Sequence, residues 1–274
     1  MDRAHIRPLR GLRDFEGCVE IQRAVWTHSD LDLTPVHQFC IAAETGAILL
    51  GAFVGKILAG YVYSFPADLG GTFCQHSHHL AVHPGFRGRG LGKRLKWAQR
   101  DEAVRRGYDL ITWTYDPMLA LNASLNLAAL GGLAGAYLDD FYGRTQALLL
   151  DRDVPTDRLL VEWRIRTRRV EERKSRPHKN AAGTKIPRAV EQKPGGAYPE
   201  IFPSRPDLAL DAKTILVEIP RNVSDLRIVP GLIGRWQRAV RKALKRYFSL
   251  GYRAEDFIAD ERCFYVLRKG KDER

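Results

Sequence analysis

The sequence HLAVHPGFRGRGLGKRL, residues 79–95, decides the fold of this chain. An apolar strand end runs through Pro84 into a loop with three alternating glycines, and a helix begins directly after the loop. Glycine permits a tight turn and a close approach of the backbone to a ligand, and the free amides at a helix start converge on a phosphate. The stretch therefore predicts an anion site, with countercharge from Arg87, Arg89, Lys93 and Arg94.

Three other interpretations of this glycine-rich stretch have to be weighed: a Walker A loop, a Rossmann fingerprint and a plain surface turn. A Walker A loop needs Ser or Thr after its lysine to bind Mg²⁺, whereas Arg94 follows Lys93 here. A Rossmann fingerprint has a different glycine spacing and belongs to a βαβ unit, whereas hairpin-like strands precede this loop. A plain turn with surface arginines is the best explanation of a lone glycine triplet, so the surrounding elements have to decide.

The pattern on both sides of the loop predicts alternating strands and helices. Two apolar runs joined at Gly55-Lys56 indicate an antiparallel hairpin, Thr34 is expected to cap a short helix that has Pro35 at its first position, and the helix after the loop has a basic outer face. In chain order we expect strand His5–Leu9, helices Leu12–Trp26 and Pro35–Glu44, hairpin Ala47–Val54 with Lys56–Phe65, strand His76–His83, helix Leu91–Arg106 with Gly107 as its C-cap, strand Leu110–Tyr115, helix Leu119–Leu130, an extended stretch to Tyr142, and strand Leu159–Ile165.

A basic segment rich in Pro and Gly divides the chain. We expect a catalytic domain over residues 1–165, a linker over 166–206, and a C-terminal α/β extension over 207–274. The extension is expected to form a strand–helix–strand–strand pattern like the second half of the first domain. It is either a degenerate half-repeat or a set of strands added to the first sheet. Its expected elements are Thr214–Ile219, Gly234–Leu250, Tyr252–Ala259 and Cys263–Arg268.

Composition and charge bound the function classes. The net charge of +12 permits binding to nucleic acid, an anionic membrane or a polyanionic cofactor. Much of the excess lies between Arg164 and Lys193, where a solvated linker is a better explanation than a nucleic-acid arm, so nucleic acid is a partner that we do not favour. The four scattered cysteines lack CxxC spacing and argue against a zinc site or a disulfide framework. No apolar run suits a membrane span or a signal core, so we expect a cytoplasmic protein without a membrane partner.

The pattern Val82-x-Pro84-x-x-Arg87-Gly88-x-Gly90-x-Gly92 resembles the signature of the GNAT (Gcn5-related) N-acetyltransferases. The element order agrees with that family over about residues 6–143, and the whole chain is similar to a predicted bacterial acetyltransferase group with a C-terminal extension. The resemblance implies an α/β (α+β) fold with a mixed, largely antiparallel central sheet flanked by helices. It also implies acetyl-CoA or another acyl-CoA as co-substrate, no metal, and a loop whose amides hold the CoA pyrophosphate: Arg87, Gly88, Arg89, Gly90, Leu91, Gly92 and Lys93.

The same resemblance implies further contacts with CoA. Leu80, Ala81 and Val82 are implied to run beside the pantetheine arm, and the strand Ile111–Tyr115 to splay from the signature strand and admit the thioester. Asn122 and Asn126 lie near the position where many family members carry an asparagine that contacts CoA.

The chain departs from the family at the usual general acid. Many members carry a tyrosine four residues before the next glycine, where it protonates the departing thiolate, but that position is Leu127 here. Tyr142 and Tyr137 are the substitutes that we consider, Tyr142 first because Gly143 follows it at an expected strand end. Packing of either ring in the core or at its rim is an equal alternative.

Acyl transfer to an amine requires a base that takes the amine proton, and histidine suits this role near neutral pH. His76 and His78 are two residues apart on one strand, so we expect them to share a face and His79 to take the other. The pair is similar to a His-x-His pair of the arylalkylamine N-acetyltransferase branch, which relays the amine proton, and we give that role to His76 and His78. A polar strand end is the alternative, and His79 and His83 are interpreted as structural. The histidines lack nearby Cys, Asp or Glu at metal-ligand spacing.

Five other side chains are weaker candidates. Glu44 and Asp116 are carboxylates that could act as partners, although each is expected to be solvated or to cap a helix. Trp26, Phe39 and Trp113 could line an acceptor pocket, although core packing is the simpler explanation for each ring.

We therefore predict an enzyme that moves an acetyl or succinyl group from acyl-CoA to a primary amine of a small molecule such as an amino acid. The amine would attack directly in a ternary complex, and the enzyme could be a homodimer. Two alternatives stay open: an acetyltransferase that associates with protein or RNA through the basic linker, and a CoA-binding module without catalysis, suggested by the missing tyrosine.

Overall fold

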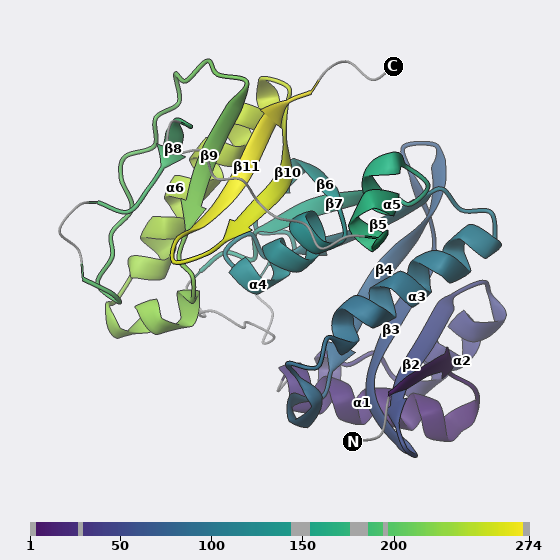
Figure 1. The fold of residues 1–274 in the computed structure, drawn as a ribbon. Coiled ribbons are helices and arrows are strands. Elements are labelled where there is room, and N and C mark those ends of the chain that lie inside the picture. The colour runs from purple at the N-terminus through teal and green to yellow at the C-terminus, as the bar shows by residue number, and fades with distance from the viewer. Residues whose placement is uncertain (1–3, 27–29, 144–153, 176–185, 194–196, 271–274) are drawn as a thin grey trace. The chain divides into compact units, whose positions relative to one another are not determined.

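The computed structural model describes residues 4–26, 30–143, 154–175, 186–193 and 197–270 (Figure 1). It contains two compact units. The N-terminal unit takes the described residues up to Trp113 together with Arg164–Glu171, and the C-terminal unit takes the rest from Thr114 onward. The chain thus passes from one unit to the other within a single strand, whereas the sequence suggested boundaries at residues 165 and 206.

The sheet of the N-terminal unit consists of β1 (His5–Pro8), β2 (Ile48–Val54), β3 (Ile57–Leu69), β4 (Thr72–Val82) and β5 (Leu110–Tyr115). Neighbours from β1 to β4 are antiparallel. β4 and β5 are parallel and pair only at Gln75 with Ile111 and His76 with Thr112. The second half of β4 therefore has no backbone pairing to β5, which agrees with the splay that the resemblance implied.

Helices cover both faces of this sheet. On one face lie α1 (Gly11–Trp26), the short 3-10 helix η1 (Asp30–Asp32) and α2 (Val36–Glu44), which enclose an aromatic-rich core. On the other face lies α3 (Leu91–Arg105). α2 begins one residue later than expected, with Pro35 rather than Thr34 at its N-cap. The reason is tertiary: the side chain of Gln22 binds both the N–H and the carbonyl of Thr34, at 2.8 and 3.1 Å, and holds it outside the helix.

The C-terminal unit contains a mixed set of parallel and antiparallel strands and one long helix (Figure 1). The strand order is β7-β6-β10-β11-β9-β8, and only the pair β8–β9 is parallel. The remaining elements are α4 (Ala120–Ala123), η3 (Ser124–Ala129), β6 (Leu133–Leu138), β7 (Arg158–Arg164), α5 (Arg168–Ser175), β8 (Arg188–Val190), β9 (Thr214–Ile219), the 3-10 helix η4 (Val223–Ile228), α6 (Leu232–Ser249), β10 (Tyr252–Ala259) and β11 (Cys263–Lys269).

The C-terminal extension continues the sheet of β6 and β7. β10 pairs with β6 through Ala254 and Ala134, and α6 buries one face rich in apolar residues, including Trp236 and Val240. The extension thus adds its strands to the sheet next to β6. The expected linker 166–206 is partly folded, because it contains α5 and β8.

Three smaller findings complete the fold. Cys18, Cys40, Cys74 and Cys263 are free thiols. Among the described helices, none combines the length and the apolar character that crossing a membrane demands. The expected helix Leu119–Leu130 is a short α-turn, α4, followed by the π-helical η3, in which Leu130 donates its N–H to the carbonyl of Leu125.

Candidate active site

The loop between β4 and α3 has an unusual backbone. After the 3-10 turn η2 (Pro84–Phe86), Gly88 and Gly90 have φ angles of 75° and 70°, and Gly90 is the N-cap of α3. A Cβ at either glycine would meet no protein atom within 4 Å. The glycines are therefore required for the left-handed backbone and for access to it, and not to avoid a clash inside the protein.

This backbone leaves donors for an anion at the helix start. The first amide of α3 with a helical partner is that of Arg94, which donates to the carbonyl of Gly90 at 3.1 Å. The N–H groups of the first helical residues before it have no partner within the helix, and the helix dipole adds to their positive potential. The loop can thus hold a diphosphate by backbone amides, as the resemblance implied for Gly88 to Lys93.

Cationic side chains surround the loop. Arg87 donates weakly to the carbonyl of Val82 at 3.4 Å, and Arg89 lies 5.2 Å from the centre of the Phe86 ring, so both guanidinium groups stay near the loop. Lys93 is exposed. Arg94 instead turns to the carbonyl of Ala4, at 2.5 Å, before β1. Three of the four predicted countercharges are therefore available to a ligand.

The predicted pantetheine strand lies directly beside this loop. Leu80 and Val82 are half-buried, and their methyl carbons would lie 3.8 and 3.9 Å from a Cβ at Gly92. Ala81 points to the opposite side and packs in the aromatic core, so only its backbone can serve a ligand.

A β-bulge in β4 changes the expected geometry of the histidines. The register with β3 moves from Tyr63–His79 to Ser64–Ser77, which leaves His78 as an extra residue without a partner. Because of this bulge, the prediction that His79 faces away from His76 and His78 is wrong. The rings of His78 and His79 are stacked, with centroids 4.3 Å apart, and His78 also contacts Tyr63.

All three imidazoles lie on the face of the sheet that carries α1 and α2. His76 contacts Phe65 and forms a hydrogen bond through Nδ1 to Thr112 Oγ1 at 3.0 Å. His79 forms one to the hydroxyl of Tyr61 at 3.0 Å and packs against Trp26. His78 is open to solvent on one side. The described residues contain no set of three or more His, Cys, Asp or Glu side chains arranged to hold a metal ion.

The aromatic surroundings keep these imidazoles neutral. Burial, with smaller contributions from the nearby His78 and Lys96, lowers the pKa of His76 to about 4. Burial also lowers the pKa of His78 and takes the pKa of His79 well below its usual value. At neutral pH each ring is therefore uncharged.

α3 buries a lysine that the sequence placed on a basic outer face. Lys96 is 2% exposed, donates to Ser77 Oγ at 3.0 Å and to Gln99 Oε1 at 2.7 Å, and its Nζ lies 3.8 Å from the centre of the Trp113 ring. Burial lowers its pKa well below the usual value. Arg100 is buried as well. Neither Lys96 nor Arg100 therefore belongs to the basic outer face of α3. Hydrophobic periodicity did not predict the burial of Lys96, because the buried stripe of α3 includes polar residues.

Two of the predicted aromatic residues belong to the core. Phe39 is fully buried between Phe15 and Tyr63, and Trp113 is buried beneath Lys96. Trp26 is half-buried, with its ring centroid 5.0 Å from that of His79. Only Trp26 therefore lies at the rim of the histidine cluster. Glu44, at the end of α2, is exposed as expected.

The predicted CoA asparagines lie on α4 and η3 in the C-terminal unit. Asn122 is half-buried, and Asn126 is 6% exposed within the π-helix. The carbonyl of Asn126 accepts the N–H of Gly132 at 2.9 Å. Leu127, at the usual tyrosine position, is fully buried in the core. A π-helix is a feature often found at functional sites, and here it contains Asn126, whereas Asn122 lies on α4 before it.

The two candidate acids differ in what their hydroxyls do. Tyr142 is 46% exposed, its hydroxyl is 3.2 Å from Thr114 Oγ1, and the Arg158 guanidinium lies 5.0 Å from the centre of its ring. Tyr137 donates its hydroxyl to Asp157 Oδ2 at 2.6 Å. Burial and this carboxylate raise the pKa of Tyr137 well above its usual value, so its proton is committed to a structural bond.

A buried acid near the end of β5 was expected to be solvated. Asp116 Oδ1 accepts the N–H of Met118 at 2.8 Å in the turn after β5, but the N-cap of α4 is Leu119 and has no side-chain hydrogen bond, so Asp116 does not cap that helix. Burial raises the pKa of Asp116 to about 6, against the opposing effects of that amide and of Arg158, which lies 3.7 Å away. Arg158 and Thr114 were missed because they lie on different strands and only the sheet brings them to Tyr142.

The N-terminal part of the chain matches a known family. The model of the acetyltransferase (GNAT) family matches residues 13–131. The match includes the signature strand, the glycine loop, α3 and the π-helix, and it confirms the GNAT fold that the sequence predicted.

Sequence and structure comparisons give more distant relatives. A mycothiol acetyltransferase from Thermobispora bispora is 39% identical over 92 residues, which is 34% of this chain and 27% of that protein. The chain thus matches only about a quarter of that relative's length.

Solved structures that are similar to this chain include those of three acetyltransferases. An N-acetyltransferase from Staphylococcus aureus has a TM-score of 0.48 at 14% identity, covering 60% of this chain and 99% of its own. The ribosomal-protein-S18-alanine N-acetyltransferase of Escherichia coli has a TM-score of 0.46 at 17% identity, with coverage of 60% and 94%. A Salmonella typhimurium structure with acetyl-CoA has 0.48 at 18% identity, with coverage of 68% and 100%.

Proposed function

We propose that this GNAT-family protein is an acyl-CoA-dependent N-acyltransferase that acts on a primary amine of a small molecule. The observation that carries the proposal is the β4–α3 loop, in which Gly88 and Gly90 take the left-handed conformation and expose the helix-start amides among Arg87, Arg89 and Lys93. The CoA diphosphate fits this donor set, since backbone amides at a helix N-terminus and nearby cations are the groups that bind phosphate in proteins.

The reaction needs one proton removed and one returned. The amine nitrogen attacks the thioester carbonyl carbon while a base takes the amine proton, the C–S bond then breaks, and the CoA thiolate receives a proton. Direct attack in a ternary complex requires no covalent intermediate on the protein. This chain therefore has to orient the thioester, keep a neutral base near the amine, and supply an acid.

His76 and His78 supply the base in this proposal. Both are neutral at physiological pH, since burial lowers the pKa of each, and His78 is open to solvent on the side where an amine would arrive. His79 belongs to the same cluster through its stacking on His78. It acts as a positioning residue, because its own Nδ1 bonds to Tyr61.

Tyr142 is the acid that we propose for the thiolate. Among the residues that the structure describes, its exposed hydroxyl bonds to Thr114, whereas the Tyr137 hydroxyl is bonded to the buried Asp157. The guanidinium of Arg158 over the Tyr142 ring favours developing negative charge on the phenol oxygen. Asn122 and Asn126 are proposed to contact CoA from the π-helical region.

Thermal-shift titrations with acetyl-CoA, succinyl-CoA and CoA test the carrying observation. A ligand at 100 times its Kd adds about 2.7 kcal/mol to the free energy of unfolding. We expect this shift for wild type, and a loss of most of it in the double variant Arg87→Ser, Arg89→Ser. The matched control is Arg13→Ser, Lys56→Ser, which removes the same charge from exposed positions on α1 and the β2–β3 turn.

Release of free CoA with a panel of primary amines then tests turnover, and the tighter of the two acyl-CoA ligands identifies the acyl group. Binding of CoA without turnover on any amine would favour the non-catalytic module instead. Absence of a shift with all three ligands would overturn the acyltransferase proposal.

A further inference from the structure

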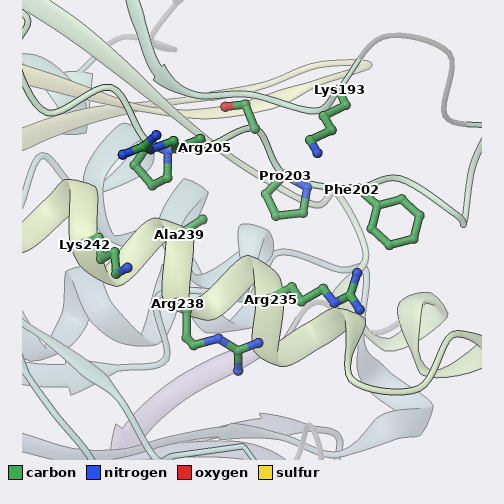
Figure 2. Close-up of a pocket in the computed structure, with 10 residues that line it drawn as sticks. Lys193, Phe202, Pro203, Arg205, Arg235, Arg238, Ala239 and Lys242 are labelled. Carbon is green, nitrogen blue, oxygen red and sulfur yellow. The ribbon is translucent and has the colours of Figure 1, made fainter.

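A basic groove lies on the solvent-exposed face of α6 in the C-terminal unit (Figure 2). None of the residues that line it is part of the acyltransferase site proposed above. It has a volume of about 350 Å³, within the range of small-ligand sites. One wall is α6 itself, with Arg235, Arg238 and Lys242. The other wall is the chain around Lys193 and residues 202–206.

Both walls are held in place by the protein alone. Positions 235, 238 and 242 share one face of the helix because they are three and four residues apart, while Trp236 and its neighbours pack on the sheet side. Trp236 Nε1 donates to the carbonyl of Ile201 at 2.7 Å, and the N–H of Lys193 donates to the carbonyl of Phe202 at 2.8 Å. The groove is therefore formed before any ligand arrives.

The charge in the groove is one-sided. Its lining has five cations, Lys193, Arg205, Arg235, Arg238 and Lys242, and no acidic residue. Within the part of the chain that the structure describes, none of these five forms an ion pair. Further along the same helix, Arg241 pairs with Asp157 at 2.7 Å and Lys245 pairs with Asp139.

Five unpaired cations around one concavity repel each other, and a bound polyanion would relieve that repulsion.

One aromatic ring lies beside the cations. Phe202 is half-buried, and the Arg235 guanidinium is 5.6 Å from its ring centroid; Figure 2 shows both at the same end of the groove. A flat ring next to a guanidinium is the arrangement on which a nucleobase stacks, while neighbouring cations hold its phosphates.

We propose that this groove binds a nucleotide unit, with its phosphates along the α6 cations and its base against Phe202. The site is separate in its residues from the acyl-CoA loop and does not depend on the proposed acyl transfer. A single-stranded RNA segment and a free nucleoside triphosphate share this chemistry, and the experiment below distinguishes them.

The experiment uses the full chain with acetyl-CoA in excess, so that the β4–α3 loop is occupied. A labelled single-stranded oligoadenylate of about 12 nucleotides serves as the probe, with ATP and tripolyphosphate as competitors, at about 50 to 200 mM salt. The variants are Arg238→Ser with Lys242→Ser, and Phe202→Leu. The charge-matched control is again Arg13→Ser with Lys56→Ser.

We expect the α6 double variant to weaken oligonucleotide binding at least tenfold and to reduce its salt slope by about 1.4, at 0.7 for each lost phosphate contact on a single strand. The control pair should change neither quantity. Phe202→Leu should weaken the binding of the oligonucleotide and of ATP but leave the binding of tripolyphosphate unchanged. Melting temperatures close to wild type are expected for the double variant, because both substituted side chains are exposed.

Tight oligonucleotide binding with weak ATP competition identifies single-stranded nucleic acid as the ligand. Weak oligonucleotide binding with strong ATP competition identifies a free nucleotide. Binding of neither, or equal losses in the groove variant and the control pair, overturns the proposal.

Discussion

The starts of α3 and α6 are built alike but leave different groups exposed. Each helix follows a strand and a 3-10 turn and has an N-cap glycine in the left-handed conformation, Gly90 with φ 70° and Gly231 with φ 73°. Each ends at a glycine with positive φ, Gly107 or Gly251, which a tyrosine and the next strand follow. The backbone frame of strand, turn, helix and strand is thus the same in both units.

The side chains around that frame separate the two helices. Before α3, Gly88 adds a second left-handed residue and the arginines of the loop are exposed. After Gly231, Leu232 and Ile233 are buried, so the start of α6 serves packing. The cations of α6 lie on its flank instead, where they line the groove. A free helix start becomes a phosphate site only where small residues and unpaired cations leave it open.

The first test compares the strands that lead into the two helices, β4 before α3 and β9 before α6. The double variant His76→Gln, His78→Gln on β4 should lower kcat by a factor of about 10² to 10⁴, the usual contribution of a general base. The Kd for acetyl-CoA should stay unchanged. Steady-state kinetics and calorimetric titration measure the two quantities.

The matched change on β9 is Glu218→Gln, which disrupts the ion pair between the buried Glu218 and the partly exposed Arg262. It should lower the free energy of unfolding by about 1–3 kcal/mol and leave kcat per folded molecule as in wild type. A full kcat in the histidine variant would remove the base role from β4.

The second test compares the two N-cap glycines. Alanine at Gly90 or Gly231 meets no atom within 4 Å but must adopt a positive φ, at a cost of about 1–2 kcal/mol in either case. We expect the same drop in melting temperature for both variants. Only Gly90→Ala should also raise the Kd for acetyl-CoA, by about tenfold or more, because the diphosphate approaches the backbone there. An equal rise for Gly231→Ala would mean that affinity reports stability alone.

The third test sharpens the roles of the two tyrosines in the C-terminal unit. Tyr142→Phe should lower kcat about tenfold, less than typical acid catalysis, because a thiolate leaves readily. Its stability should match wild type, since the hydroxyl is exposed. Tyr137→Phe should lower stability by about 1–2 kcal/mol, because the buried Asp157 loses a donor, without changing kcat. The opposite pattern would assign the acid role to Tyr137.

The smallest effect concerns the pH dependence of stability. The pKa of His76 is about 4 in the folded protein and about 6.5 in an unfolded chain, so the unfolded state binds the proton first as pH falls. Stability should therefore decrease by on the order of 1 kcal/mol for this residue between pH 6.5 and 5.

Asp116 has the opposite sign. Its folded pKa of about 6 lies above the unfolded value, so protonation below pH 6 favours the folded state. Urea unfolding of wild type, His76→Gln and Asp116→Asn across this range separates the two: the His76 variant should lose its share of the acid sensitivity, and the Asp116 variant should become more acid-sensitive than wild type. Parallel curves for all three proteins would contradict both shifts.

Much of the element order was predicted from local patterns. Strands Leu110–Tyr115, Thr214–Ile219 and Tyr252–Ala259 agree with the structure residue for residue, because each is a short run of strand-forming residues that ends at turn residues. Helices α1 and α3 agree within a residue at each end. The candidate acyl-CoA loop was predicted for the same reason, since glycine spacing and a helix start are properties of contiguous sequence.

Contacts between distant segments account for what the sequence did not show. The bulge at His78 depends on the register with β3, and it brings His79 onto the face of the other two histidines. The burial of Lys96 requires Ser77 and Trp113 from two strands. Tyr142 meets Thr114 and Arg158 only through the folded sheet.

The sequence by itself determined the GNAT-type order of elements, the glycine loop at the start of α3 and the residues that can carry acid–base chemistry. The tertiary structure decided which of those residues share a face, which protons are already committed to structural bonds, and where unpaired charge gathers on α6. The physical reason is range: backbone conformation and helix starts follow from neighbours along the chain. Register, burial and pKa follow from neighbours in space, which one sequence does not list.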